Sequence, residues 1–279
     1  MVRLAVRCSP EQAGFVLAEL AVLAPGGVEE SSGEDFVEFA IYGAEGELPE
    51  VGEIEASLGG SRVSLSSSKV DEGWEERWKE FHRPVVVESP SGDSSVWVGP
   101  PWSERPEGPA VVIDPGMAFG TGAHPTTRIC LSFLLGIAEG GGATGSLLDL
   151  GTGSGVLAIA AGRLGFDPVL ALDSESAAVE AASANARANG VAMTVSRLDL
   201  RSDPLPGSRT LVANLTGPLL VELTGRIDDG NRPARIACSG FLEADRAKVV
   251  EAFGRIGYQP VGSDAVEGWS GLMLEGTGE

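Results

Sequence analysis

The sequence predicts an α/β protein in which a small α+β domain precedes a large domain built on a parallel sheet. Three observations predict this fold class. Apolar runs of strand length alternate with helical segments from about residue 106 onward. One run leads into a glycine-rich turn, Gly151-Thr152-Gly153-Ser154-Gly155, and the next run ends on a carboxylate, Asp173. A strand, a glycine turn, a helix and a second strand ending on an acid form a Rossmann-like βαβ unit of the kind that holds a nucleoside.

Residues 1–70 are predicted to form the small domain. Pro10 is typical of the start of a helix, and residues 35–42 alternate in the manner of a strand. The predicted element order is β-α-β-β-α-β, which is that of a ferredoxin-like sandwich. We expect strands near residues 4–8, 28, 35–42 and 62–65, and helices at 10–23 and 51–58.

Residues 71–105 are predicted to connect the two domains. Trp74, Trp78 and Phe81 recur at i, i+4 and i+7, which places them on one face of a helix. Such a stripe is typical of packing between domains, and the alternative is a ligand site. Two short strands then lead into the large domain, residues 106–279.

The large domain is predicted to be doubly wound, with helices on both faces of its sheet. The last two strands have no helix between them, which predicts an antiparallel hairpin at one edge. Strands are expected at 85–87 and 96–98 in the connection and at 110–113, 147–150, 169–172, 193–196, 210–213, 235–238, 258–261 and 271–274. Helices are expected after Pro125, at 156–164, at 175–189, after Pro218 and at 242–253.

Composition narrows the function classes. Forty acidic and twenty basic residues give a formal charge of −20. This charge disfavours direct binding to nucleic acid and favours a basic protein partner. The alternative is that the acidic surface serves solubility alone. No apolar run is long enough for a membrane span or a secretory signal. Three widely spaced cysteines suit the reducing cytoplasm, and two histidines without a ligand cluster disfavour a metal site. We expect a cytoplasmic, monomeric protein.

The glycine turn alone is compatible with three interpretations. Its spacing is G-x-G-x-G after the acid Asp149, whereas nicotinamide enzymes use G-x-G-x-x-G. The observed spacing resembles the first motif of S-adenosylmethionine (SAM) methyltransferases. A nicotinamide-dependent oxidoreductase is the first alternative, and a tight turn that binds nothing is the second.

A longer segment is more specific. Asp114-Pro115-Gly116-Met117-Ala118-Phe119-Gly120-Thr121-Gly122-Ala123-His124-Pro125-Thr126-Thr127 closely resembles the signature of the PrmA-type ribosomal protein L11 methyltransferases. Val212 to Leu219 and Ser239 to Leu242 resemble two further segments of that family. The resemblance covers about residues 71–275 and implies a class I SAM-dependent methyltransferase domain. It also implies that residues 1–70 recognise the protein substrate.

The resemblance implies the site residues position by position. SAM is expected to be held by Thr127, Gly151, Asp173 and Asn214, with help from Gly153. Asp173 would accept hydrogen bonds from the ribose hydroxyls. Phe119 is assigned to a flexible lid over the cofactor, and its alternative role is core packing.

Asn214 is the candidate catalytic residue. It ends a strand at the carboxyl edge of the sheet, where ligand crevices form. Helix capping is the alternative role both for Asn214 and for Thr127. His124 is expected to hydrogen-bond within its loop rather than to act as a base. Because no Pro-Pro-aromatic run follows Asn214, the site favours an aliphatic amine over a planar amide.

The implied reaction is methylation, up to trimethylation, of lysine ε-amines of ribosomal protein L11, with its N-terminal α-amine as a further target. Transfer needs the lysine lone pair, and at pH 7 only about one lysine in 2,500 is neutral, which costs about 4.6 kcal/mol. Burial beside the cationic sulfonium lowers that cost, and a carbonyl acceptor such as Asn214 can orient the neutral amine. A lysine of a different protein remains the alternative substrate.

Overall fold

The computed structural model describes residues 2–13, 16, 20, 28–33, 35–43, 48–58, 61–69, 82–115, 120–141 and 145–277. The described residues fall into two compact units, one before residue 70 and one after residue 81. Within these ranges, the helices are too short or too polar to cross a membrane. The predicted helix with Trp74, Trp78 and Phe81 lies outside the described residues.

The N-terminal unit contains an antiparallel sheet of five strands in the order β2-β3-β1-β5-β4. Side chains that alternate along a strand point to opposite faces, so each face has its own character. One face packs a small apolar core that includes Val6, Phe39 and Val63. The strands are β1 (Val2–Cys8), β2 (Glu29–Ser32), β3 (Val37–Gly43), β4 (Ile54–Leu58) and β5 (Ser61–Lys69), and a short 3-10 helix, η1 (Pro10–Gln12), follows β1.

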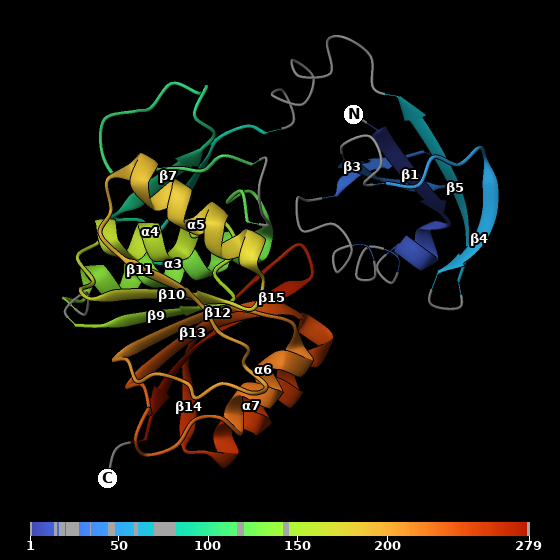
Figure 1. The fold of residues 1–279 in the computed structure, drawn as a ribbon. Helices are drawn as coiled ribbons and strands as arrows, with labels where there is room; N and C mark the ends of the chain where they lie inside the picture. The colour runs from blue at the N-terminus through green and yellow to red at the C-terminus, as the bar shows by residue number, and fades with distance from the viewer. Residues whose placement is uncertain are drawn as a thin grey trace. The chain divides into compact units, whose positions relative to one another are not determined.

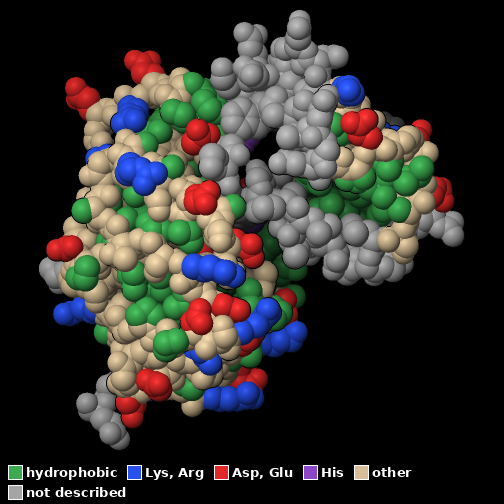
Figure 2. Space-filling view, in the orientation of Figure 1, with side chains coloured by type: hydrophobic (Ala, Val, Ile, Leu, Met, Phe, Trp, Pro, Cys, Tyr) green, Lys and Arg blue, Asp and Glu red, His purple; other side chains and the backbone are tan. Residues whose placement is uncertain are grey.

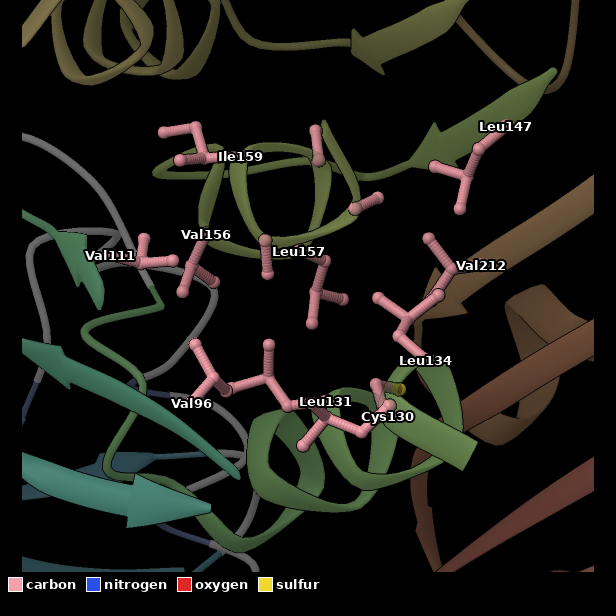
Figure 3. Close-up of a cluster of buried hydrophobic side chains, with 14 of the residues drawn as sticks. Val96, Val111, Cys130, Leu131, Leu134, Leu147, Val156, Leu157, Ile159 and Val212 are labelled. Atoms are coloured by element: carbon pink, nitrogen blue, oxygen red, sulfur yellow. The ribbon is translucent and has the colours of Figure 1, made fainter. Parts of the chain in front are cut away.

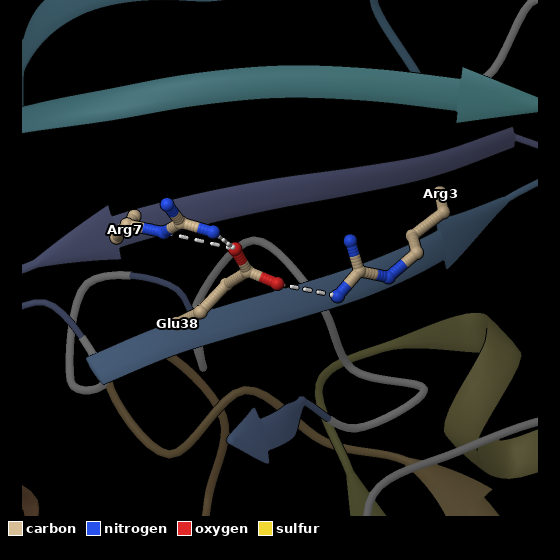
Figure 4. Close-up of polar contacts among 3 residues, drawn as sticks. All are labelled: Arg3, Arg7 and Glu38. Atoms are coloured by element: carbon tan, nitrogen blue, oxygen red, sulfur yellow. Dashed lines mark hydrogen bonds and ion pairs between the residues drawn. The ribbon is translucent and has the colours of Figure 1, made fainter. Parts of the chain in front are cut away.

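The other face of this sheet carries an ion cluster, shown in Figure 4. Glu38 accepts hydrogen bonds from Arg3 Nη2 at 2.8 Å and from Arg7 Nη2 at 2.8 Å. Burial opposes the negative charge of Glu38, but the two guanidinium groups outweigh it and lower the pKa of that carboxyl. The Arg7 guanidinium also lies 4.2 Å from the ring centre of Phe36.

The second helix predicted for this unit is wrong. Ile54–Leu58 is strand β4 and pairs antiparallel with β5, and residues 51–53 are not helical. The eight residues 51–58 are too few for a helix that is stable without tertiary packing, and pairing with β5 decides the conformation of 54–58. Of the first predicted helix, residues 13, 16 and 20 are helical and most others lie outside the described residues.

The C-terminal unit is built on a sheet of seven strands in the order β11-β10-β9-β12-β13-β15-β14. The first five run parallel, and β15 pairs antiparallel with both β13 and β14, as the predicted edge hairpin requires. The strands are β9 (Leu147–Leu150), β10 (Val169–Asp173), β11 (Thr194–Arg197), β12 (Thr210–Asn214), β13 (Arg235–Leu242), β14 (Tyr258–Val266) and β15 (Trp269–Gly276).

Helices cover both faces of this sheet, as Figure 1 shows. One face is covered by α3 (Pro125–Glu139), α4 (Val156–Arg163) and α5 (Ser176–Asn189), and the other by α6 (Gly217–Thr224) and α7 (Arg246–Arg255). The last helix begins later than predicted, because β13 continues to Leu242 and the 3-10 helix η2 (Glu243–Asp245) follows it.

A separate three-stranded sheet packs against α3, α4 and α5. It consists of β6 (Val85–Glu88), β7 (Ser95–Gly99) and β8 (Ala110–Val112). Val96 of β7 and Val111 of β8 point toward apolar side chains of α3 and α4 (Figure 3). These helices therefore lie between two sheets.

The sheet order changes direction between β9 and β12. From β9 the chain proceeds to β10 and β11 on one side, and then returns to β12 and β13 on the other. Loops that leave the carboxyl ends of β9 and β12 separate at this point, which is where doubly wound sheets form ligand crevices. The candidate site residues that the structure describes are grouped at this edge.

Candidate functional site

The turn after β9 depends on glycine at three positions. Gly151, Gly153 and Gly155 have φ values of 75°, 53° and 84°, a region that other residues rarely adopt. A Cβ on Gly151 would lie 2.5 Å from Cδ2 of Leu215. The positive φ therefore favours glycine at all three positions, and a side chain on Gly151 would also displace the side chain of Leu215 at the end of β12.

The structure brings Asp173 and Gly153 together. At the end of β10, Asp173 Oδ2 accepts a hydrogen bond from Gly153 N at 2.9 Å, and Oδ1 accepts one from Glu175 N at 3.0 Å. Each carboxylate oxygen has two lone pairs, so both oxygens retain an acceptor site. Asp173 thus fixes the glycine turn and can still bind a further donor.

The structure also brings Asn214 and Thr127 together. Asn214 Nδ2 donates to Thr127 Oγ1 at 3.3 Å, and Thr127 is 1% exposed. Neither residue caps a helix. His124 caps α3, since its Nδ1 accepts from Thr126 N at 3.3 Å, and Thr216 is the N-cap residue of α6.

The loop that leaves Asn214 is held by the next strand. Leu215 N donates to Ser239 O at 3.0 Å. Gly240 has a φ of 100°, and a Cβ there would collide with the backbone of Leu215. The Ser239-Gly240 segment, which belongs to the family resemblance described above, therefore positions the end of β12.

Asp149 lies beneath the glycine turn and is fully buried. Its Oδ2 accepts from Thr152 Oγ1 at 2.6 Å and from Ala158 N at 3.2 Å. Burial raises the pKa of this carboxyl to about 7, against the effect of these two hydrogen bonds, and the negative charge of Asp173 adds to the rise.

Two residues that position the site were missed in the sequence. Ser154 Oγ donates to Gly120 O at 2.6 Å, which ties the signature segment to the glycine turn. Asn185 donates to Ser154 O at 2.8 Å and accepts from Asp114 N at 3.2 Å. The side chains of Ser154 and Asn185 therefore hold the signature segment, residues 114–127, against the glycine turn at Gly120 and at Asp114.

The position of Asn185 could have been found. The buried residues of α5 recur at helical spacing, and most of them are alanine. Asn185 and Asn189 interrupt this alanine face at i and i+4, and a polar residue on a buried face needs partners. Asn189 satisfies this need by bonding both Val112 N and Val112 O, at 2.9 and 2.6 Å.

The remaining sequence candidates are His124 and Phe119. His124 lies 2.8 Å from Thr126 Oγ1 and packs edge-on against Trp269, with ring centres 5.1 Å apart. Burial lowers the pKa of His124 and so favours its neutral form. It bonds within its own loop, as expected. Phe119 lies outside the described residues.

Comparison with known proteins identifies the family. Residues 35–276 match the family model described as ribosomal protein L11 methyltransferase (PrmA). The chain belongs to this family. Because the family is one of SAM-dependent methyltransferases, the nicotinamide-dependent alternative is set aside.

Individual relatives agree with this assignment. A ribosomal protein L11 methyltransferase from Symbiobacterium thermophilum is 34% identical over 82% of this chain and 79% of its own length. One from Citrifermentans bemidjiense is 42% identical over 66% of this chain, and the match spans 61% of that relative. A crystal structure of ribosomal protein L11 methylase from Lactobacillus delbrueckii subsp. bulgaricus aligns with a TM-score of 0.60 at 28% identity, over 69% of this chain and 99% of that one.

Proposed function

We propose that this protein transfers methyl groups from SAM to lysine ε-amines of ribosomal protein L11, up to the trimethylated state, and also to its N-terminal α-amine. The observation that carries the proposal is the contact of Asn214 with Thr127 at the carboxyl end of β12. This contact lies beside the glycine turn, because Leu215 approaches Gly151. Two segments of the family signature thus meet at the sheet edge suited to a ligand.

The residues present suit SAM. Asp173 keeps acceptor sites for ribose hydroxyls, and the glycine turn exposes backbone that a methionyl group can approach closely. Thr127, Gly151, Gly153 and Asn214 complete the proposed binding set. SAM supplies a methyl group on a positively charged sulfur, which is ready for transfer to a neutral amine.

Asn214 orients the amine in this proposal. Its Nδ2 is engaged by Thr127, and within the described part of the chain Oδ1 accepts no hydrogen bond. Oδ1 can therefore accept an N–H from a neutral lysine amine and direct the lone pair toward the methyl group. An amide does not titrate, so the lysine proton leaves to solvent before transfer rather than to Asn214.

The two units take different roles in the proposal. Residues 1–70 recognise the substrate protein, residues 71–105 connect the domains, and residues 106–279 carry out methyl transfer. A net charge of −20 attracts a basic substrate. On the face in Figure 2, basic side chains are scattered among acidic ones. We propose that the protein acts as a cytoplasmic monomer.

The test uses the purified full-length chain, purified ribosomal protein L11 and SAM with a labelled methyl group. Intact-mass and peptide mass spectrometry should show mass gains of up to three methyl groups per modified amine. In a second assay, a cell extract replaces purified L11. Label on a different protein would support the methyltransferase assignment and reject L11 as the substrate. Absence of SAM binding by calorimetry would reject the cofactor assignment.

Variants test the role of Asn214. Asn214→Ala is expected to lower kcat at least tenfold, because the amine loses its acceptor. Thr216→Ala is the matched control, since Thr216 is exposed, lies two residues away and makes no side-chain cap bond. Full turnover by Asn214→Ala would remove Asn214 from the mechanism.

A further inference from the structure

Asp149 is a buried carboxylate without a cationic partner among the described residues. It is 0% exposed, and both hydrogen bonds that it accepts from described residues go to Oδ2. Oδ1 is buried and has no hydrogen-bond partner in the described part of the chain. An ionised carboxylate in such a place is unfavourable unless a positive charge or a proton compensates it.

The described groups that face Asp149 add no positive charge. Asp173, at the end of the neighbouring strand β10, contributes a negative charge that favours the protonated form of Asp149. On α3, the fully buried thiol of Cys130 interacts with Asp149 and has a raised pKa, so it stays neutral. Thr152 and Ala158 offer neutral hydrogen-bond donors.

Asp149 is also connected directly to the proposed cofactor turn. Its two hydrogen bonds reach Thr152, within the glycine turn, and Ala158, in the first turn of α4. The charge of Asp149 is therefore placed beneath the segment that would hold SAM. A cation bound at this turn stabilises the ionised form of a nearby buried carboxylate.

We propose, on the basis of the SAM assignment above, that Asp149 holds a proton in the empty site and releases it to solvent when SAM binds. The O–H bond of Asp149 breaks, the proton passes to the buffer, and the carboxylate remains beneath the turn that would hold SAM. No other bond changes. S-adenosylhomocysteine (SAH), which remains after methyl transfer, has no sulfonium charge, so Asp149 takes a proton back and discriminates between SAM and SAH.

The experiment is isothermal titration calorimetry of the full-length protein with SAM and, separately, with SAH. Runs in phosphate and in imidazole, which both buffer over the pH range used and differ in ionisation enthalpy, give the number of protons released. Because burial raises the pKa of Asp149 to about 7, proton release on binding SAM should be largest at pH 6 and should fall toward pH 8. SAH should release less at each pH, and both ligands carry the same amino group.

Two variants separate Asp149 from other proton sources. Asp149→Asn, of the same shape, should bind SAM without release. Thr152→Val removes a donor that favours the carboxylate, so release should persist to higher pH, whereas Thr152→Ser keeps the donor and should resemble the wild type. Thr152→Val also tests the proposal if Asp149→Asn fails to fold.

The results distinguish this inference from the proposed function. Release that is unchanged in Asp149→Asn, or equal for SAM and SAH, would overturn the proton coupling. Binding of SAM by the wild type without release at any pH from 6 to 8 would overturn it as well and leave the methyltransferase assignment intact. Failure to bind SAM at any pH would overturn the cofactor assignment and, with it, this inference.

Discussion

Thr127 fixes the orientation of the Asn214 amide. The two residues are 87 positions apart, yet Nδ2 of Asn214 donates to Oγ1 of Thr127 at 3.3 Å. The oxygen and nitrogen of an amide lie on opposite sides of its carbon, so engagement of Nδ2 directs Oδ1 away from Thr127. The contact therefore joins the first turn of α3 to the end of β12 and sets which atom of Asn214 is offered to a substrate.

Thr127→Val should lower kcat about tenfold, because loss of one hydrogen bond of about 1.4 kcal/mol frees the Asn214 amide to rotate. Thr127→Ser keeps the hydroxyl and should stay within about threefold of the wild type. Steady-state kinetics with purified L11 measures both. Equal rates for the valine and serine variants would show that the hydroxyl has no role in orienting Asn214.

Asp173→Asn should weaken SAM binding by about 10- to 100-fold, because hydrogen bonds to a charged acceptor become neutral ones and the tie to Gly153 weakens. Calorimetry gives the dissociation constant. Glu175→Gln is the control: it removes a charge at the same edge, while its backbone N–H still donates to Asp173. If both variants lose affinity equally, general charge and not the Asp173 hydrogen bonds governs binding.

Gly240→Ala should destabilise the protein by at least about 2 kcal/mol. The substitution forces a Cβ against the backbone of Leu215 and places alanine at a φ of 100°. Chemical denaturation measures the change. Gly254→Ala, within α7 and with open space around it, should be neutral or slightly stabilising. An unperturbed Gly240→Ala variant would show that Leu215 can move without cost.

Stability should depend on the charge of Asp149. Its pKa is about 7 in the folded protein and 3.8 when unperturbed, so at intermediate pH the native state holds a proton that the unfolded chain has lost. Raising the pH therefore lowers the free energy of unfolding, by about 3 kcal/mol between pH 5 and 8. Above about pH 8 Asp149 is ionised in both states and the effect ends.

The comparison of wild type with Asp149→Asn isolates this effect from the other acidic groups. Urea denaturation at pH 5, 6, 7 and 8 should show the stability of the variant rising relative to the wild type from pH 5 and levelling off toward pH 8. A difference that is constant across this range would mean that Asp149 is ionised throughout.

The fold of the C-terminal unit could be predicted because its elements carry local signals. The apolar run 147–150 predicts a strand, the glycines predict a turn, and the residues from Val156 predict a helix. The structure has β9 and α4 at these positions. Strand β4 could not be predicted in this way. Ile54–Leu58 contains good helix formers, and its strand conformation depends on pairing with β5, a tertiary interaction that outweighs weak local propensity.

The candidate site shows the same division. Asp173 and Asn214 could be found because they end strands, and their neighbours Gly153 and Thr127 belong to recognisable motifs. Ser154 and Asn185 could not be assigned from motifs, because their role is to bond backbone atoms at Gly120 and Asp114, far away in the sequence. Such contacts are set by the fold. For Asn185 the sequence shows only a polar residue on an otherwise apolar face of α5, and Ser154 lies in the glycine turn, where a small polar residue is ordinary.

The pairing of Asn189 with Val112 has a consequence for the smallest piece of this chain that can fold. Strand β8 belongs to the three-stranded sheet and has no partner in the seven-stranded sheet. On this ground alone, the seven-stranded sheet would be expected to fold without it. Yet the backbone of Val112 forms hydrogen bonds with both the oxygen and the nitrogen of the Asn189 side chain, and Asn189 is only 6% exposed. A chain shortened to begin after Ile113 would lose both Val112 partners and leave the Asn189 amide only its hydrogen bond to Asn185 O at 2.8 Å, with its oxygen unpaired, so an autonomous methyltransferase module should retain β8.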